Sequence, residues 1–125
     1  MLRTVCKGKI HRATVTQADL NYMGSVTIDK VLMDAADIRA FEIVQITNLS
    51  TGTIWQTYAI EGTPGSGTLC LNGPPARHFH AGDKVIILSL SIVTEEEWAR
   101  LEPRLVYVDD RNQILSVVRH KTADP

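Results

Sequence analysis

The sequence predicts a mainly β fold closed into a barrel, with two or three short helices. Apolar and β-branched residues recur in short runs separated by turn residues such as Gly, Asn and Asp. The run Lys84 to Val93 is nearly continuous Val, Ile and Leu, which is typical of a strand buried on both faces. Helical patterns are few and short. Many short strands with so few helices favour a closed barrel over an open sheet.

The amino-terminal part predicts two strands and a helix. Leu2 to Val15 carries apolar or β-branched residues in rough alternation, with Gly8 as a bulge or a point of close approach. Val26-Thr27-Ile28 is a second apolar run. Asp29 to Ala36 has the pattern of a short helix, with Asp29 near its N-terminus.

The middle of the chain alternates strands and turns. Glu42 to Asn48 and Ile54 to Ile60 are predicted strands separated by the turn Ser50-Thr51-Gly52. Thr68 to Leu71 is another predicted strand, ended by Asn72-Gly73, which is a strong hairpin-turn signal.

The carboxyl-terminal part begins with the turn Ala81-Gly82-Asp83 before the long apolar run. Thr94 and Glu97 fit a capping box, which predicts a helix start with acidic residues at the positive end of its dipole. Val106-Tyr107-Val108 predicts a final strand, and the polar residues His120 to Pro125 are expected to fray.

Size and composition set the class of protein. The chain has 125 residues, which suits one domain, 1–125, and a formal charge of −1 from 13 basic and 14 acidic side chains. The sequence has no basic tract that would indicate binding to nucleic acid or to a membrane surface. No apolar segment is long enough to span a bilayer. Cys6 and Cys70 are too few for a disulfide framework and are interpreted as buried thiols. We therefore expect a cytoplasmic protein that binds neither nucleic acid nor membrane.

A spaced set of motifs carries the functional signal. It comprises Arg3-Thr4, Gly8 to Ala13, Val15-Thr16, Ala18-Asp19-Leu20, Tyr22-Met23-Gly24-Ser25, Asp34-Ala35-Ala36, Thr57-Tyr58-Ala59-Ile60, Asn72-Gly73 and Gly82-Asp83. In this order and spacing the set strongly resembles the bacterial aspartate 1-decarboxylases, up to about Val108. A Gly-Ser pair alone would indicate only a turn before a strand.

The resemblance implies a double-psi β-barrel whose cofactor is made from its own chain. The Ser25 hydroxyl attacks the Gly24 carbonyl, and elimination and hydrolysis then give residues 1–24 (the β chain) and residues 25–125 (the α chain) with a pyruvoyl group derived from Ser25 at the new N-terminus. Gly24 has no Cβ, so a strained or positive-φ geometry is open to it. The pyruvoyl carbonyl forms a Schiff base with an amino-acid substrate and accepts the electrons left when CO2 departs.

The resemblance also assigns roles to several residues, each with a structural alternative. Tyr58 would return a proton to the intermediate, although strand tyrosines often have only a packing role. Thr57 would assist cleavage and contact the substrate. Lys9 would bind a substrate carboxylate, although a surface lysine is the commoner case. His11 and Tyr22 match positions near the processing site. The remaining substrate contacts fall at Asn72 and Gly73.

Two departures from the family affect substrate preference. Ile54 stands where the family usually has an arginine that pairs with the side-chain carboxylate of aspartate, and loss of such a contact costs about 1.5–3 kcal/mol. Arg3, Arg12 and Arg77 are the candidates to replace it from another direction. Pro74-Pro75 replaces alanines and removes backbone N–H groups.

A metal site is not predicted. His78 and His80 would share one face of a strand, but no third ligand is close in the sequence, and the family needs no metal.

Three functions remain open. The first is decarboxylation of aspartate to β-alanine, which feeds pantothenate synthesis in the family. The second is pyruvoyl-dependent decarboxylation of a less acidic amino acid, for which Ile54 is the motive. The third is a non-catalytic barrel that binds a partner. The resemblance further implies a homotetramer with active sites at subunit interfaces, and the need for a maturation factor is left open.

Overall fold

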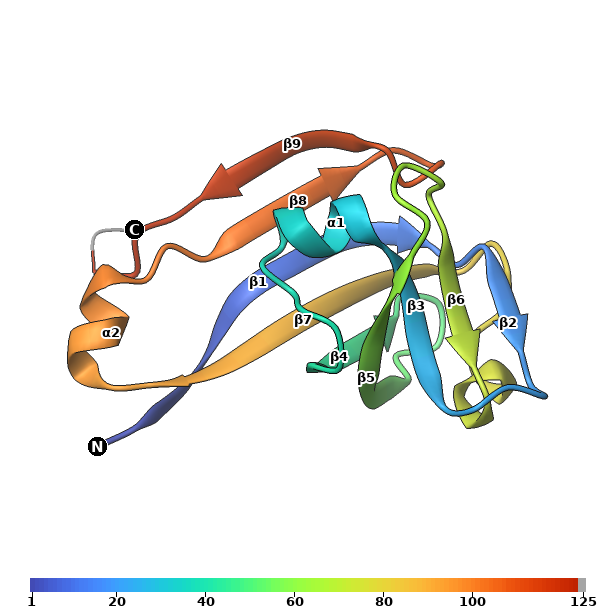
Figure 1. Cartoon of the computed structure of the whole chain (residues 1–125), viewed down its shortest axis with the longest axis horizontal. Coiled ribbons are helices and arrows are strands. Elements are labelled where there is room, and N and C mark those ends of the chain that lie inside the picture. Colours follow the sequence, from blue (N-terminus) through green and yellow to red (C-terminus); the bar gives the residue numbers. More distant parts are fainter. Residues whose placement is uncertain (124–125) are drawn as a thin grey trace.

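The computed structural model describes residues 1–123, and its fold is mainly β (Figure 1). The strands are β1 Arg3–Thr14, β2 Gln17–Asp19, β3 Ser25–Asp29, β4 Ile43–Asn48, β5 Ile54–Gly62, β6 Leu69–Asn72, β7 Lys84–Val93, β8 Arg104–Val108 and β9 Ile114–Arg119. The helices are α1 Lys30–Ala35, the single-turn 3-10 helix η1 Pro74–Arg77 and α2 Glu95–Arg100. The predicted mainly β fold with two or three short helices is confirmed.

The strands close into a barrel. Their order is β2-β6-β3-β5-β4-β7-β1-β8-β9, and β2 continues β1 through Val15 and Thr16. The Val15 N–H donates to the Asp83 carbonyl (2.8 Å), and the Thr16 N–H donates to the Leu69 carbonyl (2.8 Å). The β1–β2 stretch therefore pairs with β7 through β1 and with β6 through β2, which closes the barrel.

Two insertions define the topology of this barrel. Strand β3 lies between β5 and β6, and the β1–β2 stretch lies between β6 and β7. In both places a strand is inserted between two strands that follow each other along the chain. The barrel is thus of the double-psi type that the family resemblance implies.

The interior is filled by one apolar cluster. Its largest fully buried members include Phe79, Ile10, Ile28, Leu32, Met33, Ile46, Leu69, Leu71 and Ile87. Burying each of these side chains contributes about 1.5–3 kcal/mol to folding. Leu32 and Met33 come from α1, which the buried Asp29 caps by accepting from the Val31 N–H (2.8 Å), as the sequence predicts.

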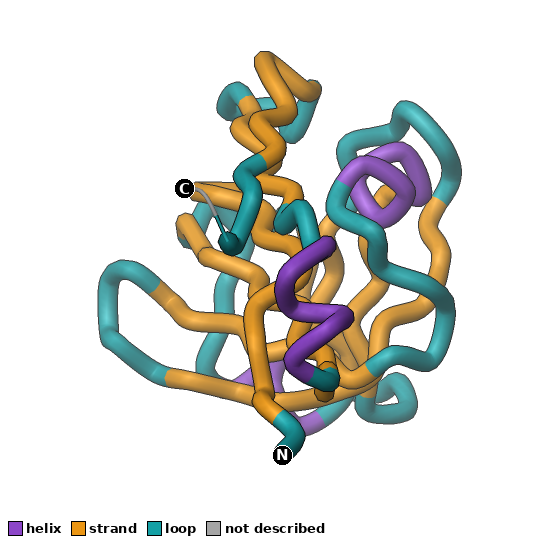
Figure 2. Tube along the Cα trace, turned by 90° about the vertical axis from the view of Figure 1, so that its left-hand side faces the viewer, coloured by secondary structure: helices purple, strands orange, loops and turns teal. Residues whose placement is uncertain are grey.

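The remaining elements extend away from the barrel. Figure 1 shows α2 at the opposite end of the molecule from β2 and β6, linked to the barrel by the long strand β7. The β8–β9 hairpin runs along the molecule, and Asn112 in its turn donates to the Gly67 carbonyl in the loop between β5 and β6 (2.8 Å). Viewed from the end at which α2 lies, the trace consists mainly of strands and loops (Figure 2). The predicted capping box of Thr94 and Glu97 is present. Among residues 1–123, no helix has both the length and the apolar content needed to cross a membrane.

Gly8 confirms its predicted role. The register between β1 and β7 shifts between Cys6 and Gly8, as expected for a bulge. A Cβ at Gly8 would overlap the Ala36 carbonyl oxygen, so the first strand approaches the end of α1 too closely for any side chain. A glycine is therefore required here by packing.

Four predictions about the fold are wrong. Strand β7 alternates between buried and exposed residues instead of being buried on both faces, and Leu90 and Ile92 are 38% and 67% exposed. The Asn72-Gly73 pair leads into η1 and makes no β-hairpin. Strand β8 is not the last, because β9 follows it.

The fourth concerns the carboxyl terminus. The His120 N–H donates to the Pro103 carbonyl (3.1 Å) and the Thr122 N–H donates to the Leu101 carbonyl (3.2 Å), so these residues do not fray. Residues 124–125 of the predicted frayed segment lie outside the described residues.

Candidate active site around Ser25

Ser25 is the first residue of β3 and is 1% exposed. On one side it pairs directly with Asn72 of β6. On the other side β3 runs parallel to β5, with Val26 opposite Ala59. Ser25 comes one residue before Val26, and Tyr58 comes one residue before Ala59, so these two residues lie next to each other on the neighbouring strands. Residues side by side on neighbouring strands share a face of the sheet. The structure therefore brings Ser25, Asn72 and Tyr58 to one place.

A hydrogen-bond network fixes the Ser25 hydroxyl. The Asn72 Nδ2 donates to Ser25 Oγ (2.9 Å) and to Thr27 Oγ1 (3.0 Å). The Ser25 hydroxyl itself donates to the Met23 carbonyl (3.4 Å). The Asn72 Oδ1 accepts from the Cys70 thiol (3.1 Å). Both polar ends of the Asn72 side chain are thus used, and the serine oxygen is held next to its own backbone.

The space for the Gly24–Ser25 peptide is made by Gly73. A Cβ on Gly73 would lie 2.8 Å from the Tyr22 carbonyl oxygen and 2.9 Å from the Gly24 nitrogen. Gly73 also has a φ of 76°, a conformation that residues with a Cβ rarely adopt. The sequence predicts such freedom at Gly24, but Gly24 has no positive φ, and a Cβ there would lie 3.6 Å from Pro74 Cδ. The position in this region where the backbone conformation and the packing require a glycine is therefore Gly73.

Tyr58 is half-buried and lies beside Phe41. The two rings stack with centroids 5.5 Å apart and an interplanar angle of 17°. Thr57 precedes Tyr58 on the same strand, so its side chain points to the opposite face. No hydrogen bond joins the Thr57 side chain to Ser25 or Gly24 within residues 1–123. Of this pair, Tyr58 is the one that shares the face of the Ser25 hydroxyl.

Lys9 and His11 lie elsewhere on the barrel. Lys9 pairs with Leu88 of β7 and Leu105 of β8, and neither of these strands pairs with β3 or β6. His11 pairs with Tyr107, whose ring is edge-on at 5.5 Å. Burial, and then the positive charges of Lys9 and of Arg12, lower the pKa of His11. The described chain does not bring these two side chains to its own Ser25.

Tyr22 lies close to the site through its backbone. Its carbonyl faces Gly73, while the residue as a whole is 55% exposed and the neighbouring Met23 is 76% exposed. The segment before the Gly24–Ser25 bond is thus at the surface, whereas Ser25 is buried.

Ile54, at the start of β5, is 58% exposed. Of the arginines that might replace the missing family arginine, Arg3 is bound to Glu95 (2.6 Å). Arg77 is in the last turn of η1, which directly follows Asn72 and Gly73. Arg12 is exposed on β1, so Arg77 is the candidate that follows Asn72 and Gly73 most closely in the chain.

Comparison with known proteins decides the family. A family model described as aspartate decarboxylase matches residues 1–115. The aspartate 1-decarboxylase of Caldicellulosiruptor saccharolyticus is 52% identical over 94% of this chain and 91% of its own length. That of Listeria monocytogenes is 49% identical over 98% and 97%, and that of Bacillus cereus is 52% identical over 94% and 93%. The chain belongs to the aspartate decarboxylase family.

The rationally designed protein mkDPBB_sym1 matches with a TM-score of 0.46 and 16% identity, over 70% of this chain and 99% of its own.

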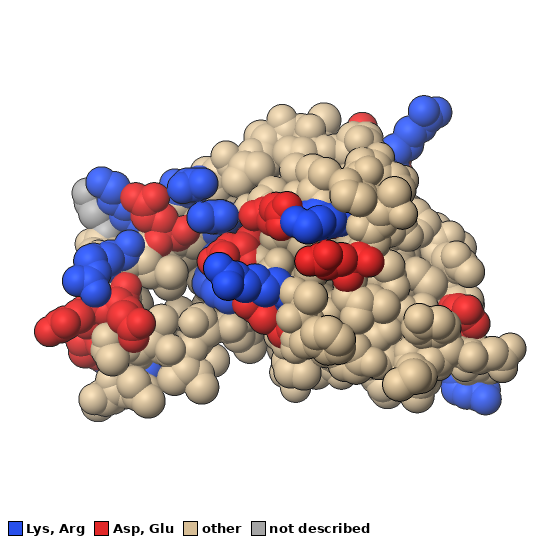
Figure 3. Space-filling model, in the orientation of Figure 1, with Lys and Arg blue, Asp and Glu red and all other residues tan. Residues whose placement is uncertain are grey.

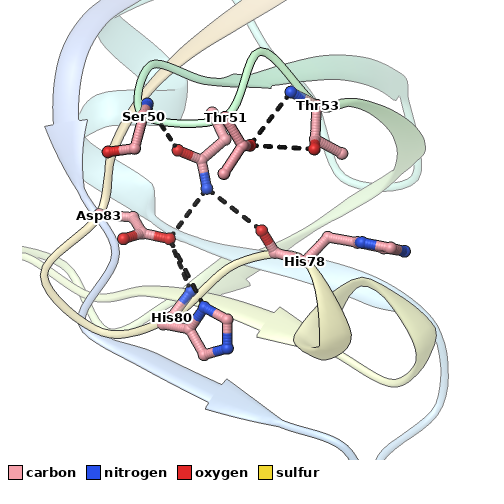
Figure 4. Close-up of polar contacts among 7 residues, drawn as sticks. Ser50, Thr51, Thr53, His78, His80 and Asp83 are labelled. Atoms are coloured by element: carbon pink, nitrogen blue, oxygen red, sulfur yellow. Dashed lines mark hydrogen bonds and ion pairs between the residues drawn. The ribbon is translucent and has the colours of Figure 1, made fainter.

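The backbone at the histidine pair of this aspartate decarboxylase family member is held by Asn48 and Asp83. His78 and His80 follow η1 and are not in a strand, contrary to the prediction. The Asn48 Nδ2 donates to the His78 carbonyl (3.1 Å) and to Asp83 Oδ2 (2.8 Å), and the His80 N–H donates to the same carboxylate oxygen (2.9 Å). The His78 imidazole points away from His80 and Asp83 (Figure 4). Within residues 1–123, no three potential ligand side chains gather as a metal site would require.

An apolar groove of about 260 Å³ lies apart from Ser25 on the aspartate decarboxylase barrel, over β1, β4, β5 and β7. It is lined by Thr4, Ile43, Val44, Gln45, Gln56, Leu90, Ser91 and Ile92.

Figure 3 shows charges of both signs interleaved over one part of the surface and a broad uncharged area over the β3–β5–β6 side.

Sequence reasoning missed two members of the Ser25 network. Thr27 and Cys70 pair directly across β3 and β6, one step beyond Ser25 and Asn72 on the same face. The available signal was the i, i+2 spacing of Cys70 and Asn72 and of Ser25 and Thr27, which places each pair on one face of a strand.

Proposed function

We propose that this chain is the precursor of a pyruvoyl-dependent decarboxylase that cleaves itself between Gly24 and Ser25 and converts L-aspartate to β-alanine and CO2. The observation that carries the proposal is the buried Ser25 hydroxyl, held by Asn72 next to Gly24 in a member of the aspartate decarboxylase family. Aspartate is the substrate named for its relatives.

The maturation step uses groups of this chain alone. Ser25 Oγ attacks the Gly24 carbonyl carbon, the C–N bond breaks, and the hydroxyl proton moves to the nitrogen, leaving an ester. Elimination breaks the Ser25 Cβ–O bond and releases residues 1–24 with a carboxylate at Gly24. Water then hydrolyses the unsaturated residue 25, which releases ammonia and leaves a pyruvoyl group. The exposure of Tyr22 and Met23 supports this route, because the released end has a path to solvent.

The residues around position 25 fit a pyruvoyl group. The Asn72 amide nitrogen donates to Ser25 Oγ, an oxygen that leaves with Gly24, so this N–H would then be free to donate to a pyruvoyl group at residue 25. Gly73 leaves the adjoining backbone uncrowded on the side of Gly24. This group supplies a carbonyl that binds the substrate amine and accepts the electrons released with CO2. The Tyr58 phenol, on the same face, would return a proton to the substrate carbon. The proposed role of Thr57 in assisting cleavage is supported by the family resemblance alone.

Intact mass spectrometry of the purified, denatured protein tests the proposal. We expect two species, residues 1–24 and residues 25–125, with the larger one modified by phenylhydrazine at a pyruvoyl cap. Ser25→Ala is expected to leave one full-length species. Ser89→Ala is the matched control, since Ser89 is also buried but lies on β7. Unmodified full-length wild-type protein would favour the non-catalytic barrel, and cleavage only after addition of cell extract would assign maturation to a second protein.

Ile54 supports a second candidate, a decarboxylase of a less acidic amino acid. An exposed isoleucine offers no charge to the carboxylate of an aspartate side chain. Comparison of kcat/KM for aspartate with that for neutral amino acids decides between the candidates. If aspartate is the poor substrate, Ile54→Arg is expected to raise its kcat/KM by roughly tenfold or more. Efficient turnover of aspartate by the wild-type enzyme would exclude this candidate.

We also propose that the enzyme works as a homotetramer with active sites between subunits. Lys9 is on a strand that does not pair with β3 or β6, so a Lys9 that binds the substrate carboxylate would come from a second copy. The exposed Phe41, Ile43 and Ile92 offer apolar surface for such contacts. Light scattering with size-exclusion chromatography measures the subunit number.

We place the reaction in the cytoplasm, where the free thiols Cys6 and Cys70 stay reduced.

A further inference from the structure

Cys70 lies next to Asn72 on the same face of β6 and pairs with Thr27 of β3. We propose that Cys70 is a positioning residue for self-cleavage: its thiol donates to Asn72 Oδ1 and so directs the Asn72 amide nitrogen at Ser25 Oγ. This inference rests on the proposed self-cleavage. It assigns a function to a side chain that otherwise serves only as a small buried group.

The network needs one group that sets the direction of the amide. The Ser25 hydroxyl has only a long contact as a donor, to the Met23 carbonyl (3.4 Å), and the Thr27 hydroxyl can donate or accept, so neither hydroxyl fixes which end of the Asn72 side chain faces it. A protonated thiol carries one donor hydrogen, and its sulfur is only a weak acceptor. With its sulfur 3.1 Å from Asn72 Oδ1, Cys70 is satisfied only when the oxygen faces it, and Nδ2 then lies 2.9 Å from Ser25 Oγ.

The surroundings of Cys70 keep its thiol protonated. The residue is 8% exposed, and burial, followed by the negative charge of Asp19, raises the pKa of the thiol. A backbone hydrogen bond at Asp19 acts in the opposite direction and is the smallest of the three effects. At neutral pH the thiol therefore acts as the donor that the network requires.

Packing does not account for this arrangement. The barrel interior is filled from β6 by Leu69 and Leu71, whereas Cys70 is not part of that apolar cluster. Its sulfur instead contacts a polar atom of the Ser25 network. A side chain needed only for its volume would have no reason to make this contact.

The test compares Cys70→Val, which keeps a similar volume but has no donor, with Cys70→Ser, which restores one. Cleavage of freshly synthesised precursor is followed by intact mass in a cell-free reaction. Cys70→Val is expected to cleave roughly five- to tenfold more slowly than wild type, and Cys70→Ser within about twofold of it. Cys6→Val is the matched control, because the Cys6 thiol donates only to the Gly8 carbonyl (3.2 Å) on β1.

Two results would overturn the inference. Cleavage of Cys70→Val at the wild-type rate would show that the donor has no effect, and equal slowing in Cys70→Val and Cys70→Ser would show a packing role. Failure of wild-type protein to cleave would instead count against the proposed function.

A second measurement is independent of cleavage. In the Ser25→Ala background, NMR hydrogen exchange of the Asn72 side-chain amide is expected to be slower with Cys70 or Cys70→Ser than with Cys70→Val. Equal exchange in all three variants would contradict the positioning role whether or not the wild-type protein cleaves.

Discussion

Asn72 and Ser25, 47 residues apart in the sequence, are joined by a hydrogen bond of 2.9 Å from the asparagine amide to the serine hydroxyl oxygen. The bond crosses the antiparallel pairing of β3 and β6, in which the two residues lie directly opposite each other. Both residues are buried, at 4% and 1% exposed. The nucleophile proposed for self-cleavage is therefore held by a residue from a different part of the chain.

Asn72→Ala is expected to slow cleavage at Gly24–Ser25 by roughly 10- to 100-fold, because it removes a buried hydrogen bond to the attacking oxygen. The time course of intact mass measures this rate. Asn112→Ala is the control for general destabilisation, since Asn112 is also buried and donates to the carbonyls of Thr14 and Gly67 (both 2.8 Å) away from Ser25. Equal slowing in both variants would contradict a specific role for Asn72.

Gly73→Ala is expected to slow cleavage and to destabilise the precursor more than Gly52→Ala does. Gly73 and Gly52 have nearly the same φ, 76° and 75°, so the backbone strain, about 1–2 kcal/mol, is shared. Only at Gly73 does the new Cβ meet other atoms, those of Tyr22 and Gly24, because nothing lies within 4 Å of a Cβ at Gly52. Urea unfolding and cleavage rates of the two variants measure the difference. Identical behaviour would mean that the Tyr22–Gly24 segment moves aside without cost.

Tyr58→Phe is expected to cleave normally and to lose decarboxylase activity by roughly 100-fold or more, as for loss of a general acid. Phenylalanine keeps the stacking with Phe41, so the fold is preserved. The measurement is kcat of fully cleaved protein with aspartate. Tyr107→Phe, which alters the ring beside His11, is the matched control. Normal turnover by Tyr58→Phe would remove Tyr58 from the mechanism.

His11 is expected to make the folded state sensitive to acid. Its Nδ1 is buried and has no hydrogen-bond partner among the described residues, and its pKa is lowered first by burial and then by Lys9 and Arg12. The folded protein therefore binds the proton less readily than the unfolded chain does. The contribution of His11 to stability is present above its ordinary pKa of about 6.5 and is lost as the pH falls below that value.

This pH dependence can be measured by urea unfolding of wild type and His11→Gln at several pH values. The stability of wild type relative to His11→Gln should decrease as the pH is lowered from about 7.5 to about 5. His120→Gln is the control for loss of an exposed imidazole. A difference that stays constant over this range would contradict the assignment.

The sequence by itself determined the local features of this protein. Apolar runs bounded by turn residues located most strands, the Asp29 and Thr94 side chains marked the starts of α1 and α2, and Gly8 marked the bulge in β1. These features depend on neighbours within a few residues, so the pattern of residue types contains them. The spaced motifs around Gly24 and Ser25 also identified the family that the comparisons confirm.

Only the tertiary structure decided what surrounds Ser25. Strand β6 lies beside β3 through pairing of distant segments, and that pairing alone brings Cys70 and Asn72 to the serine hydroxyl and Gly73 to the scissile peptide. It also leaves Lys9 and His11 on other strands and one face of β7 exposed. Periodicity shows which residues share a face of one strand, but not which strand becomes its neighbour, because register is set by contacts between residues far apart in the chain.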